Sequence, residues 1–395
     1  MTLRERDEAV FFHTYARLPL EFDRGSGMHL WTRGGEPYLD MFSGVAVNAL
    51  GHAHPEVVRA IARQAERFIH VSNYYLQESQ IALAELLVKH SGYPRVFFAN
   101  TGTESFEGAL KIARKWGSVR GKRQLLAMSN AFHGRTMGAL SLMDRPKYRE
   151  GFGPFLANCE VVEFNNPAAL TGAVSSDTAA VIVEFIQGEG GIRPVSADFA
   201  ATLRHLQQHN DFLIIADEVQ SGLGRTGKFF AFDHFGIRPD VVVLAKPIGG
   251  GLPLGAILGS DRVADVLQPG THGTTFGGNP VACAAGVAVV TAIAERGLMN
   301  NARDMGILLR DGLASLQSAF PAHVREVRGL GLMAGMELAS EGEPVVEAMR
   351  KRRILINCTD RTVLRFLPPL IVQKEHIQET VAALRDSLKD VFPAA

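Results

Sequence analysis

The sequence predicts an α/β fold in which a large domain with a mainly parallel sheet is joined to a smaller α+β domain. First, short apolar runs rich in β-branched or aromatic residues recur through the middle of the chain, separated by stretches with helical patterning. Second, the pattern changes after about Gly297 to long amphipathic helices with a few short strands. Third, 395 residues exceed the length of one ordinary domain.

The expected strands of the large domain are runs too apolar to face water on either side. They span residues 95–99, 124–128, 179–185, 212–216 and 241–245. The helices expected around them span residues 105–119, 198–209 and 279–295. Such alternation is typical of βαβ units, in which helices cover both faces of a parallel sheet.

The rest of the chain is expected to form the smaller domain. Helical patterns at 300–319 and 374–388 are interleaved with strands at 327–338 and 363–368. The expected division of the chain has three parts: an N-terminal segment that belongs to the small domain, 1–50, the large domain, 51–296, and the C-terminal small domain, 297–395.

Composition excludes several classes of function. Lys and Arg number 41, as do Asp and Glu, so no bulk charge draws the protein to nucleic acid or to an anionic membrane. The cysteines, Cys159, Cys283 and Cys358, lack the paired spacing of a disulfide framework or a zinc cluster, which fits a reducing compartment. His52 and His54 have no carboxylates at ligand spacing nearby, and no metal site is expected.

Two segments bear on location. Residues 1–16 carry several charges and no apolar stretch of the kind found in signal peptides. The apolar run at 281–293 is rich in small residues and too short for a membrane span. A cytoplasmic protein is therefore expected.

Two charged residues end predicted strands. Asp217 follows Phe-Leu-Ile-Ile-Ala, and Lys246 follows Val-Val-Val-Leu-Ala. Ligands of open α/β sheets bind beyond the carboxyl ends of the strands, so both side chains are expected at the mouth of one cleft. An isolated Asp or Lys there more often only caps its strand. A lysine after five apolar residues, however, is suited to lose its proton and form a Schiff base.

A candidate phosphate site lies at residues 100–104, Asn-Thr-Gly-Thr-Glu, between a predicted strand and a predicted helix. Gly102 lets backbone amides approach an anion, and the N-terminus of a helix favours negative charge. The string is neither a Walker A loop nor a GxGxxG fingerprint. By itself a Thr-Gly-Thr turn is more often a plain helix cap, so this site needs support from other motifs.

Eight motifs, in order along the chain, resemble those of one enzyme family. They lie at residues 51–55 (GHAHP), 100–104 (NTGTE), 132–136 (FHGRT), 187–191 (QGEGG), 217–222 (DEVQSG), 244–246 (LAK), 272–280 (HGTTFGGNP) and 364–369 (LRFLPP). From about Tyr15 to the last helix, the chain resembles the class III (ornithine-type) aminotransferases of the fold-type-I pyridoxal-phosphate superfamily, most closely those for acetylornithine. The resemblance implies a seven-stranded, mainly parallel sheet and the cofactor pyridoxal 5'-phosphate.

The resemblance also gives roles to residues near the strand ends. Lys246 would hold the cofactor as a Schiff base and then move the substrate proton as general base and acid. Asp217 would keep the pyridine nitrogen protonated. Phe132 and Val219 would contact opposite faces of the ring, and Gln220 would bond its phenolic oxygen. Without the flanking motifs, Phe132 and Val219 would be read as ordinary core residues.

The phosphate group would be shared between two subunits. Gly102 and Thr103 match the family residues that bind it through backbone amides and a hydroxyl, and Thr275 matches a threonine that the partner subunit contributes. A homodimer with shared active sites follows from the resemblance. Nothing in the composition shows it.

Substrate recognition would depend on two arginines. Arg135 matches the residue that binds the α-carboxylate of an ornithine-like substrate, and Arg365 matches the one that binds the α-carboxylate of 2-oxoglutarate or glutamate. Glu189 would pair with Arg365 while the first substrate is bound and swing away for glutamate. A planar guanidinium donates two parallel hydrogen bonds to a carboxylate, although most arginines form only surface ion pairs.

One departure from the ornithine enzymes favours an acylated substrate. Those enzymes carry a tyrosine near the free α-amine of ornithine, and Gly44 stands at the equivalent position here. A small residue leaves room for an acyl group, and Thr274 would contact the substrate from across the dimer. The resulting hypothesis is transfer of the distal amine of N2-acetylornithine to 2-oxoglutarate, in arginine biosynthesis.

Other readings stay open at this point. Ornithine, succinylornithine, an acylated lysine or 4-aminobutyrate could be the amine donor, because one methylene changes binding by only about 1–3 kcal/mol. An aminomutase on the same scaffold would not need the pair of Glu189 and Arg365. A non-catalytic pyridoxal-phosphate-binding protein is a further alternative, but no DNA-binding segment precedes the fold.

Overall fold

A twisted seven-stranded sheet forms the centre of the computed structural model, which describes residues 1–393. Its strand order is β4-β12-β11-β10-β7-β5-β6, and β12 is antiparallel to both of its neighbours while the remaining pairs are parallel. The strands are β4 (Arg95–Ala99), β5 (Gln124–Met128), β6 (Cys159–Val162), β7 (Thr178–Val183), β10 (Leu213–Asp217), β11 (Val241–Leu244) and β12 (Gly255–Gly259). The predicted mainly parallel sheet is confirmed.

The five strands predicted for the large domain agree with the structure to within two residues at each end, whereas the single strand predicted at 327–338 is wrong: this segment forms the antiparallel pair of β13 (Val324–Leu330) and β14 (Met333–Leu338). Two strands, β6 and β12, have no counterpart among the predicted runs. β6 is an edge strand whose Glu160 faces solvent, and β12 is a short Gly-Ala-Ile-Leu-Gly segment. The apolar part of β6 is only two valines after Glu160, and β12 is bounded by two glycines, so their sequences predict strands only weakly.

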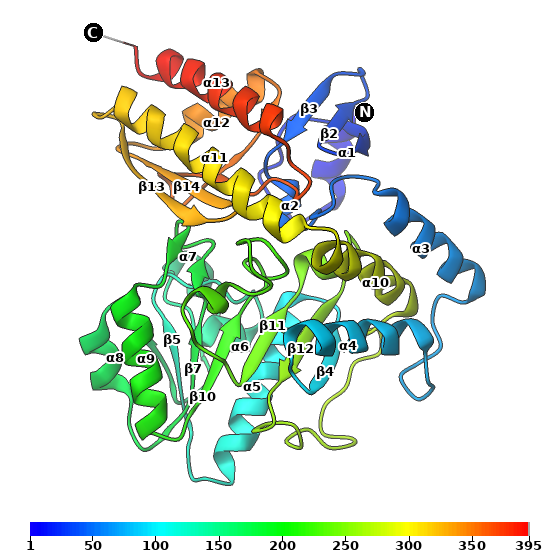
Figure 1. Cartoon of the computed structure of the whole chain (residues 1–395), viewed down its shortest axis with the longest axis vertical. Helices are drawn as coiled ribbons and strands as arrows, with labels where there is room; N and C mark the ends of the chain where they lie inside the picture. Colours follow the sequence, from blue (N-terminus) through cyan, green and yellow to red (C-terminus); the bar gives the residue numbers. More distant parts are fainter. Residues whose placement is uncertain (394–395) are drawn as a thin grey trace.

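Helices cover both faces of this sheet (Figure 1). Alternate residues of a strand point to opposite faces, so Leu213 and Ile215 pack in one core with α5 (Gly102–Ser118), and Ile214 and Ala216 pack in the other. The second core includes α4 (Glu78–Ser91), α9 (Ala197–His209) and α10 (Pro280–Glu295). Also in this part of the chain are α3 (Pro55–Arg67), α6 (Met137–Ser141), α7 (Pro146–Arg149), α8 (Pro167–Ala173), η1 (Ala231–His234) and η2 (Lys246–Gly249).

Two smaller sheets lie above the carboxyl ends of the parallel strands (Figure 1). One consists of β1 (Phe22–Ser26), β2 (His29–Thr32), β3 (Pro37–Asp40) and β15 (Ile354–Leu355), and it joins the two ends of the chain. The other consists of β13 (Val324–Leu330), β14 (Met333–Leu338), β17 (Val363–Phe366) and β16 (Asn357–Thr359). Around them lie α1 (Leu3–Val10), α2 (Ser43–Ala46), α11 (Leu298–Ala319), α12 (Glu343–Lys351) and α13 (Lys374–Val391).

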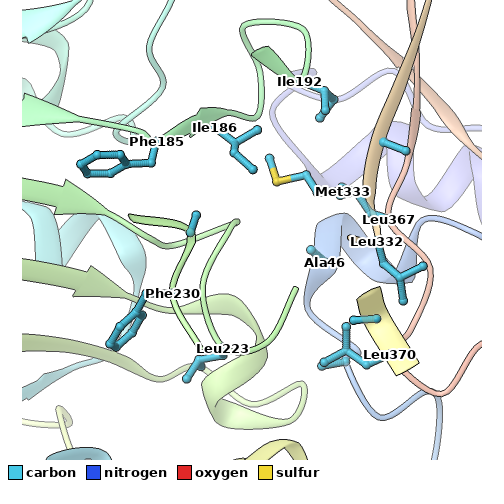
Figure 2. Close-up of a cluster of buried hydrophobic side chains, with 14 of the residues drawn as sticks. Ala46, Phe185, Ile186, Ile192, Leu223, Phe230, Leu332, Met333, Leu367 and Leu370 are labelled. Carbon is cyan, nitrogen blue, oxygen red and sulfur yellow. The ribbon is translucent and has the colours of Figure 1, made fainter. Parts of the chain in front are cut away.

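An apolar cluster joins the large sheet to the small ones. Figure 2 shows Ile186 and Ile192 from the hairpin of β8 (Ile186–Gln187) and β9 (Arg193–Pro194) near Met333 of β14, with Leu223 and Leu370 below them. All five side chains are at most 1% exposed. Burying apolar side chains releases about 25 cal/mol per Å², so this cluster resists separation of the two parts.

No one helix among residues 1–393 is long and apolar enough to cross a membrane. Only α10 and α11 taken together meet the criteria of length and composition, and they are bent by 65°.

Candidate active site

A cavity of about 500 Å³ opens at the carboxyl ends of the parallel strands. Its walls come from the ends of β10 and β11, the N-terminus of α5, and the loops after β4, β5 and β8. Of the predicted site residues, the following line it: Gly102, Thr103, Phe132, Arg135, Glu189, Asp217, Val219, Gln220 and Lys246. The predicted cleft beyond the strand ends is therefore present.

Lys246 follows β11 directly after Ala245 and begins the short helix η2. Its φ of 49° is in the left-handed region, which is unfavourable for a residue with a Cβ and has to be maintained by the surrounding structure. Removal of water from its ammonium group lowers the pKa of Lys246, and the nearby charges of Asp217 and Glu189 oppose that shift. A lowered pKa increases the fraction of free amine, which is the nucleophilic form.

Asp217 is the last residue of β10 and is 5% exposed. Its Oδ2 lies 2.7 Å from Nδ1 of His133, and its Oδ1 accepts the backbone N–H of Val219 at 3.1 Å. The His133 ring stacks on Phe106 with centroids 4.4 Å apart. Since a carboxylate can only accept, Nδ1 of His133 carries the hydrogen of this contact. The histidine thus fixes the direction of the Asp217 carboxyl.

Sequence reasoning missed His133, and it also missed Glu184. Glu184 is buried and accepts the backbone N–H of Phe132 at 3.1 Å and that of Gly188 at 3.4 Å. Burial raises the pKa of Glu184 to about 7, although the charge of His133 opposes the shift. Both residues left a signal: His133 stands inside the Phe-His-Gly-Arg-Thr motif, and Glu184 is a carboxyl in an otherwise apolar run.

The N-terminus of α5 faces the cavity with Gly102 and Thr103. Thr101 caps the helix, and its Oγ1 accepts the N–H of Glu104 at 3.2 Å. The first amides of a helix have no partner within the helix, so those of Gly102 and Thr103 are available to an anion. A Cβ added to Gly102 would lie 2.9 Å from Val219, so this close approach of the backbone requires glycine.

Glu189, in the upper wall of the cavity, forms an ion pair with Arg365, which is not itself among the lining residues. Arg365 Nη1 donates to Glu189 Oε1 at 2.5 Å and lies 3.4 Å from Gln220 Oε1, while Arg365 Nε donates to Asn357 Oδ1 at 3.0 Å. Arg365 is 2% exposed. Burial alone would raise the pKa of Glu189, but the Arg365 guanidinium, assisted by Lys246 and Arg145, brings it below its usual value.

Arg135 is exposed at the cavity and forms no ion pair among the described residues. Its guanidinium lies 4.0 Å from the ring centroid of Tyr148 and 5.4 Å from that of Phe132. Stacking on aromatic faces fixes the plane of a guanidinium while leaving its N–H groups to bind a carboxylate. The two arginines therefore differ: Arg365 already has a carboxylate partner, and Arg135 has none.

Besides Arg365, three residues named for the site do not line this cavity. Thr275 is exposed, and Thr274 instead accepts a hydrogen bond from Asn100 Nδ2 at 3.1 Å. Gly44 has a φ of 61° and belongs to a left-handed turn over 43–46, next to Val47, which does line the cavity. Roles across a dimer for Thr274 and Thr275, and room for an acyl group at Gly44, stay predictions.

The family model of the class-III aminotransferases matches residues 11–388. The chain belongs to this family. An acetylornithine aminotransferase of Caldanaerobacter subterraneus subsp. tengcongensis is 45% identical over 390 residues, which are 98% of each chain. One of Aquifex aeolicus is 45% identical over 379 residues, 95% of this chain and 99% of that one.

Solved structures of aminotransferases agree with the fold. The ornithine aminotransferase of Toxoplasma gondii superposes with a TM-score of 0.94 at 33% identity, over 98% of this chain and 94% of that one. A transaminase from the marine bacterium Virgibacillus gives a TM-score of 0.92 at 26% identity, over 98% of both chains. These findings confirm the predicted family and fold class.

The protein is a pyridoxal-phosphate-dependent transaminase, as its family membership establishes, and the predicted enzyme class and cofactor are confirmed. The residues present fit that cofactor. A cavity that places a lysine with a lowered pKa beside a buried carboxylate, opposite a helix N-terminus with free amides, suits an aldehyde, a ring nitrogen and a phosphate.

Proposed function

We propose that this class-III aminotransferase transfers the distal amine of N2-acetylornithine to 2-oxoglutarate, in arginine biosynthesis in the cytoplasm. The observation that carries the proposal is the contrast between Arg135, which is free, and Arg365, which Glu189 neutralises. One cation is ready for the carboxylate of the first substrate, and the other becomes available only when Glu189 leaves. Relatives named acetylornithine aminotransferase, at 41–45% identity, support the choice of substrate.

Lys246 would hold the cofactor and transfer protons. When bound, pyridoxal phosphate withdraws electrons from the carbon that bears the amine, so that a proton on this carbon becomes removable. The amine of Lys246, whose pKa burial lowers, would take that proton as general base and return it as general acid. Asp217, oriented by His133 at 2.7 Å, would hold a proton on the pyridine nitrogen.

The neighbouring residues would orient the cofactor. Gly102 and Thr103 would bind its phosphate at the N-terminus of α5. Phe132, Val219 and Gln220, which line the same cavity, would position the ring. Glu184 would support Phe132 through the backbone N–H that it accepts.

Discrimination between the two substrates would depend on charge. While the acylated substrate is bound through Arg135, Glu189 would neutralise Arg365 and leave no second site for a carboxylate. Glutamate and 2-oxoglutarate carry an additional carboxylate, and they would displace Glu189 from Arg365. In this exchange the Arg365 guanidinium, which now has a carboxylate at 2.5 Å, replaces one anionic partner with another, so its own buried charge stays paired.

A second copy of this chain would complete the site. Large exposed apolar side chains gather on two adjoining loops, with Ile69 63%, Tyr75 68%, Leu76 93% and Phe276 60% exposed. The side chain of Asn73 joins these loops by donating to the carbonyls of Thr274 and Gly277. Exposed apolar surface of this kind is typical of a subunit interface. Thr274 and Thr275 lie on it, so a homodimer would bring them to the partner's cavity.

The test is a panel of single half-reactions of the holoenzyme, followed through the visible absorbance of the cofactor. N2-acetylornithine, ornithine, succinylornithine, acetyl-lysine and 4-aminobutyrate are compared as amine donors by kcat/KM. We expect kcat/KM for N2-acetylornithine to exceed that for ornithine by roughly tenfold or more. The acetyl group would fill space that ornithine leaves empty, which contributes about 1–3 kcal/mol. A clear preference for ornithine would refute the proposal.

A further inference from the structure

The main-chain carbonyl of Glu189 has two side-chain donors from different parts of the chain. Arg145 Nη2, in the segment before α7, donates at 2.9 Å. Thr359 Oγ1, at the end of β16, also lies at 2.9 Å, while the same hydroxyl is 3.4 Å from Glu189 Oε2. A hydroxyl has one hydrogen, so Thr359 donates to the nearer carbonyl. The large domain and the C-terminal sheet thus both hold the backbone of Glu189.

The residues on either side of Glu189 are fixed as well. The N–H of Gly188 donates to Glu184 at 3.4 Å, and the carbonyl of Gly191 accepts from Arg328 Nε at 2.8 Å. A Cβ on Gly190 would lie 2.6 Å from Gln187 Oε1, so the glycines of this hairpin are closely packed rather than loose. Backbone held at successive residues has little freedom to move as a loop.

The position of the Arg145 side chain leaves one of its buried N–H groups without a hydrogen bond within residues 1–393. Its Nε is buried with no hydrogen-bond partner among the described residues, and its Nη2 lies 3.5 Å from Asp360 Oδ1. An unsatisfied buried N–H is unfavourable, so the remaining contacts of this guanidinium outweigh that loss. Those contacts are to Asp360 and to the Glu189 carbonyl, which indicates that the guanidinium acts on the backbone of Glu189.

We propose that Thr359 and Arg145 are positioning residues that hold the main chain of Glu189 still, so that the exchange between half-reactions is a rotation of this side chain alone. The inference rests on the proposed function. A fixed main chain keeps the Glu189 carboxylate at a high effective concentration near Arg365. Glu189 then competes well against substrate carboxylates until one with the geometry of glutamate arrives. A loosened main chain makes Glu189 a weaker competitor.

The experiment compares Thr359→Val with wild type in both half-reactions of the holoenzyme. Valine keeps the shape and removes the hydroxyl. We expect the apparent Kd for glutamate to fall about fivefold, the effect of one net hydrogen bond, because Arg365 is less occupied. The limiting rate of the N2-acetylornithine half-reaction should fall by a similar factor, because its carboxylate then also binds at Arg365, where the distal amine is not placed for reaction. Thr359→Ser restores the hydroxyl and should restore both values.

Two further variants separate positioning from general loosening. Thr362→Val makes the same change on the same turn, where the hydroxyl hydrogen-bonds only the Asp360 carbonyl among residues 1–393, and should alter neither half-reaction. Arg145→Gln should shift the two half-reactions in opposite directions, as Thr359→Val does. If Thr359→Val weakens both half-reactions or leaves both unchanged, the inference is wrong. If the wild-type enzyme lacks one of the half-reactions, the proposed function fails instead.

Discussion

The floor of the cavity and its upper wall hold charged groups in different ways. On the floor, Asp217 is bonded to His133 at 2.7 Å, and His133 is stacked between the sheet and α5 at 4.4 Å from Phe106. On the wall, Glu189 and Arg365 are opposite charges that satisfy one another at 2.5 Å. A histidine inside a packed core has one position, whereas an ion pair can exchange one partner for a substrate. The comparison indicates that the groups on the floor are fixed in place for the chemistry, whereas the ion pair on the wall can exchange a partner and so select the substrate.

The largest effect should come from the floor. Lys246→Ala removes the amine that would hold the cofactor and move the proton, so we expect kcat to fall by roughly 10³-fold or more in both half-reactions. The variant should melt near the temperature of the wild-type apoenzyme, because alanine fits the space at the end of β11. Turnover and thermal unfolding are measured side by side. Lys389→Ala, at a side chain 61% exposed, serves as the control.

A wall variant should damage one half-reaction far more than the other. Arg365→Ala removes the cation for glutamate and leaves Glu189 without its partner, which costs about 3 kcal/mol for a buried pair and corresponds to roughly 10²-fold. We expect that loss in kcat/KM for glutamate and a much smaller one for N2-acetylornithine. Equal losses of kcat/KM in the two half-reactions would show that the wall does not select between the substrates.

Arg135→Ala should give the complementary result at a smaller scale. Arg135 is exposed and unpaired, so its truncation leaves no buried charge behind. We expect a loss of about 2 kcal/mol, roughly thirtyfold, in kcat/KM for N2-acetylornithine, the usual contribution of a hydrogen bond to a charged group. The glutamate half-reaction, measured on the same preparation, should change less than about threefold.

The residues on the floor of the cavity could be predicted from the sequence, because they stand at the ends of buried strands. The runs before Asp217 and Lys246 are apolar throughout, which predicts both the strand and the position of the charge after it. The strands β6 and β12 were not predicted, because Glu160 interrupts the apolar pattern of the first and glycines bound the second. The pair of Glu189 and Arg365 joins residues 176 positions apart, and only the resemblance to a known family predicted it.

Tertiary contacts between residues outside the recognised motifs could not be predicted from the sequence. Thr359 and Arg145 meet at one carbonyl because the C-terminal sheet contacts the hairpin of β8 and β9 through β13, and neither residue type is unusual at its position. His133 could have been found, since it stands between Phe132 and Arg135 in a motif already singled out. A buried polar residue beside a known site residue is worth considering as its support.

A smaller effect than that of either arginine variant should be the most informative about the dimer. Thr275 is exposed in its own chain and lines no wall of that chain's cavity. If it binds the cofactor phosphate of a partner subunit, Thr275→Ala should lower kcat/KM by about tenfold, the effect of one charge-assisted hydrogen bond. Steady-state kinetics at saturating cofactor measure this loss.

Mixing two damaged chains then decides which subunit supplies Thr275. In a dimer of Lys246→Ala with Thr275→Ala, one cavity combines an intact Lys246 from one chain with an intact Thr275 from the other. Random pairing makes half of the dimers mixed, so about a quarter of all sites become complete. Co-expressed chains should therefore be several-fold more active than the same amounts expressed apart. If Thr275 served its own chain, no site in the mixture would be complete and the activities would simply add.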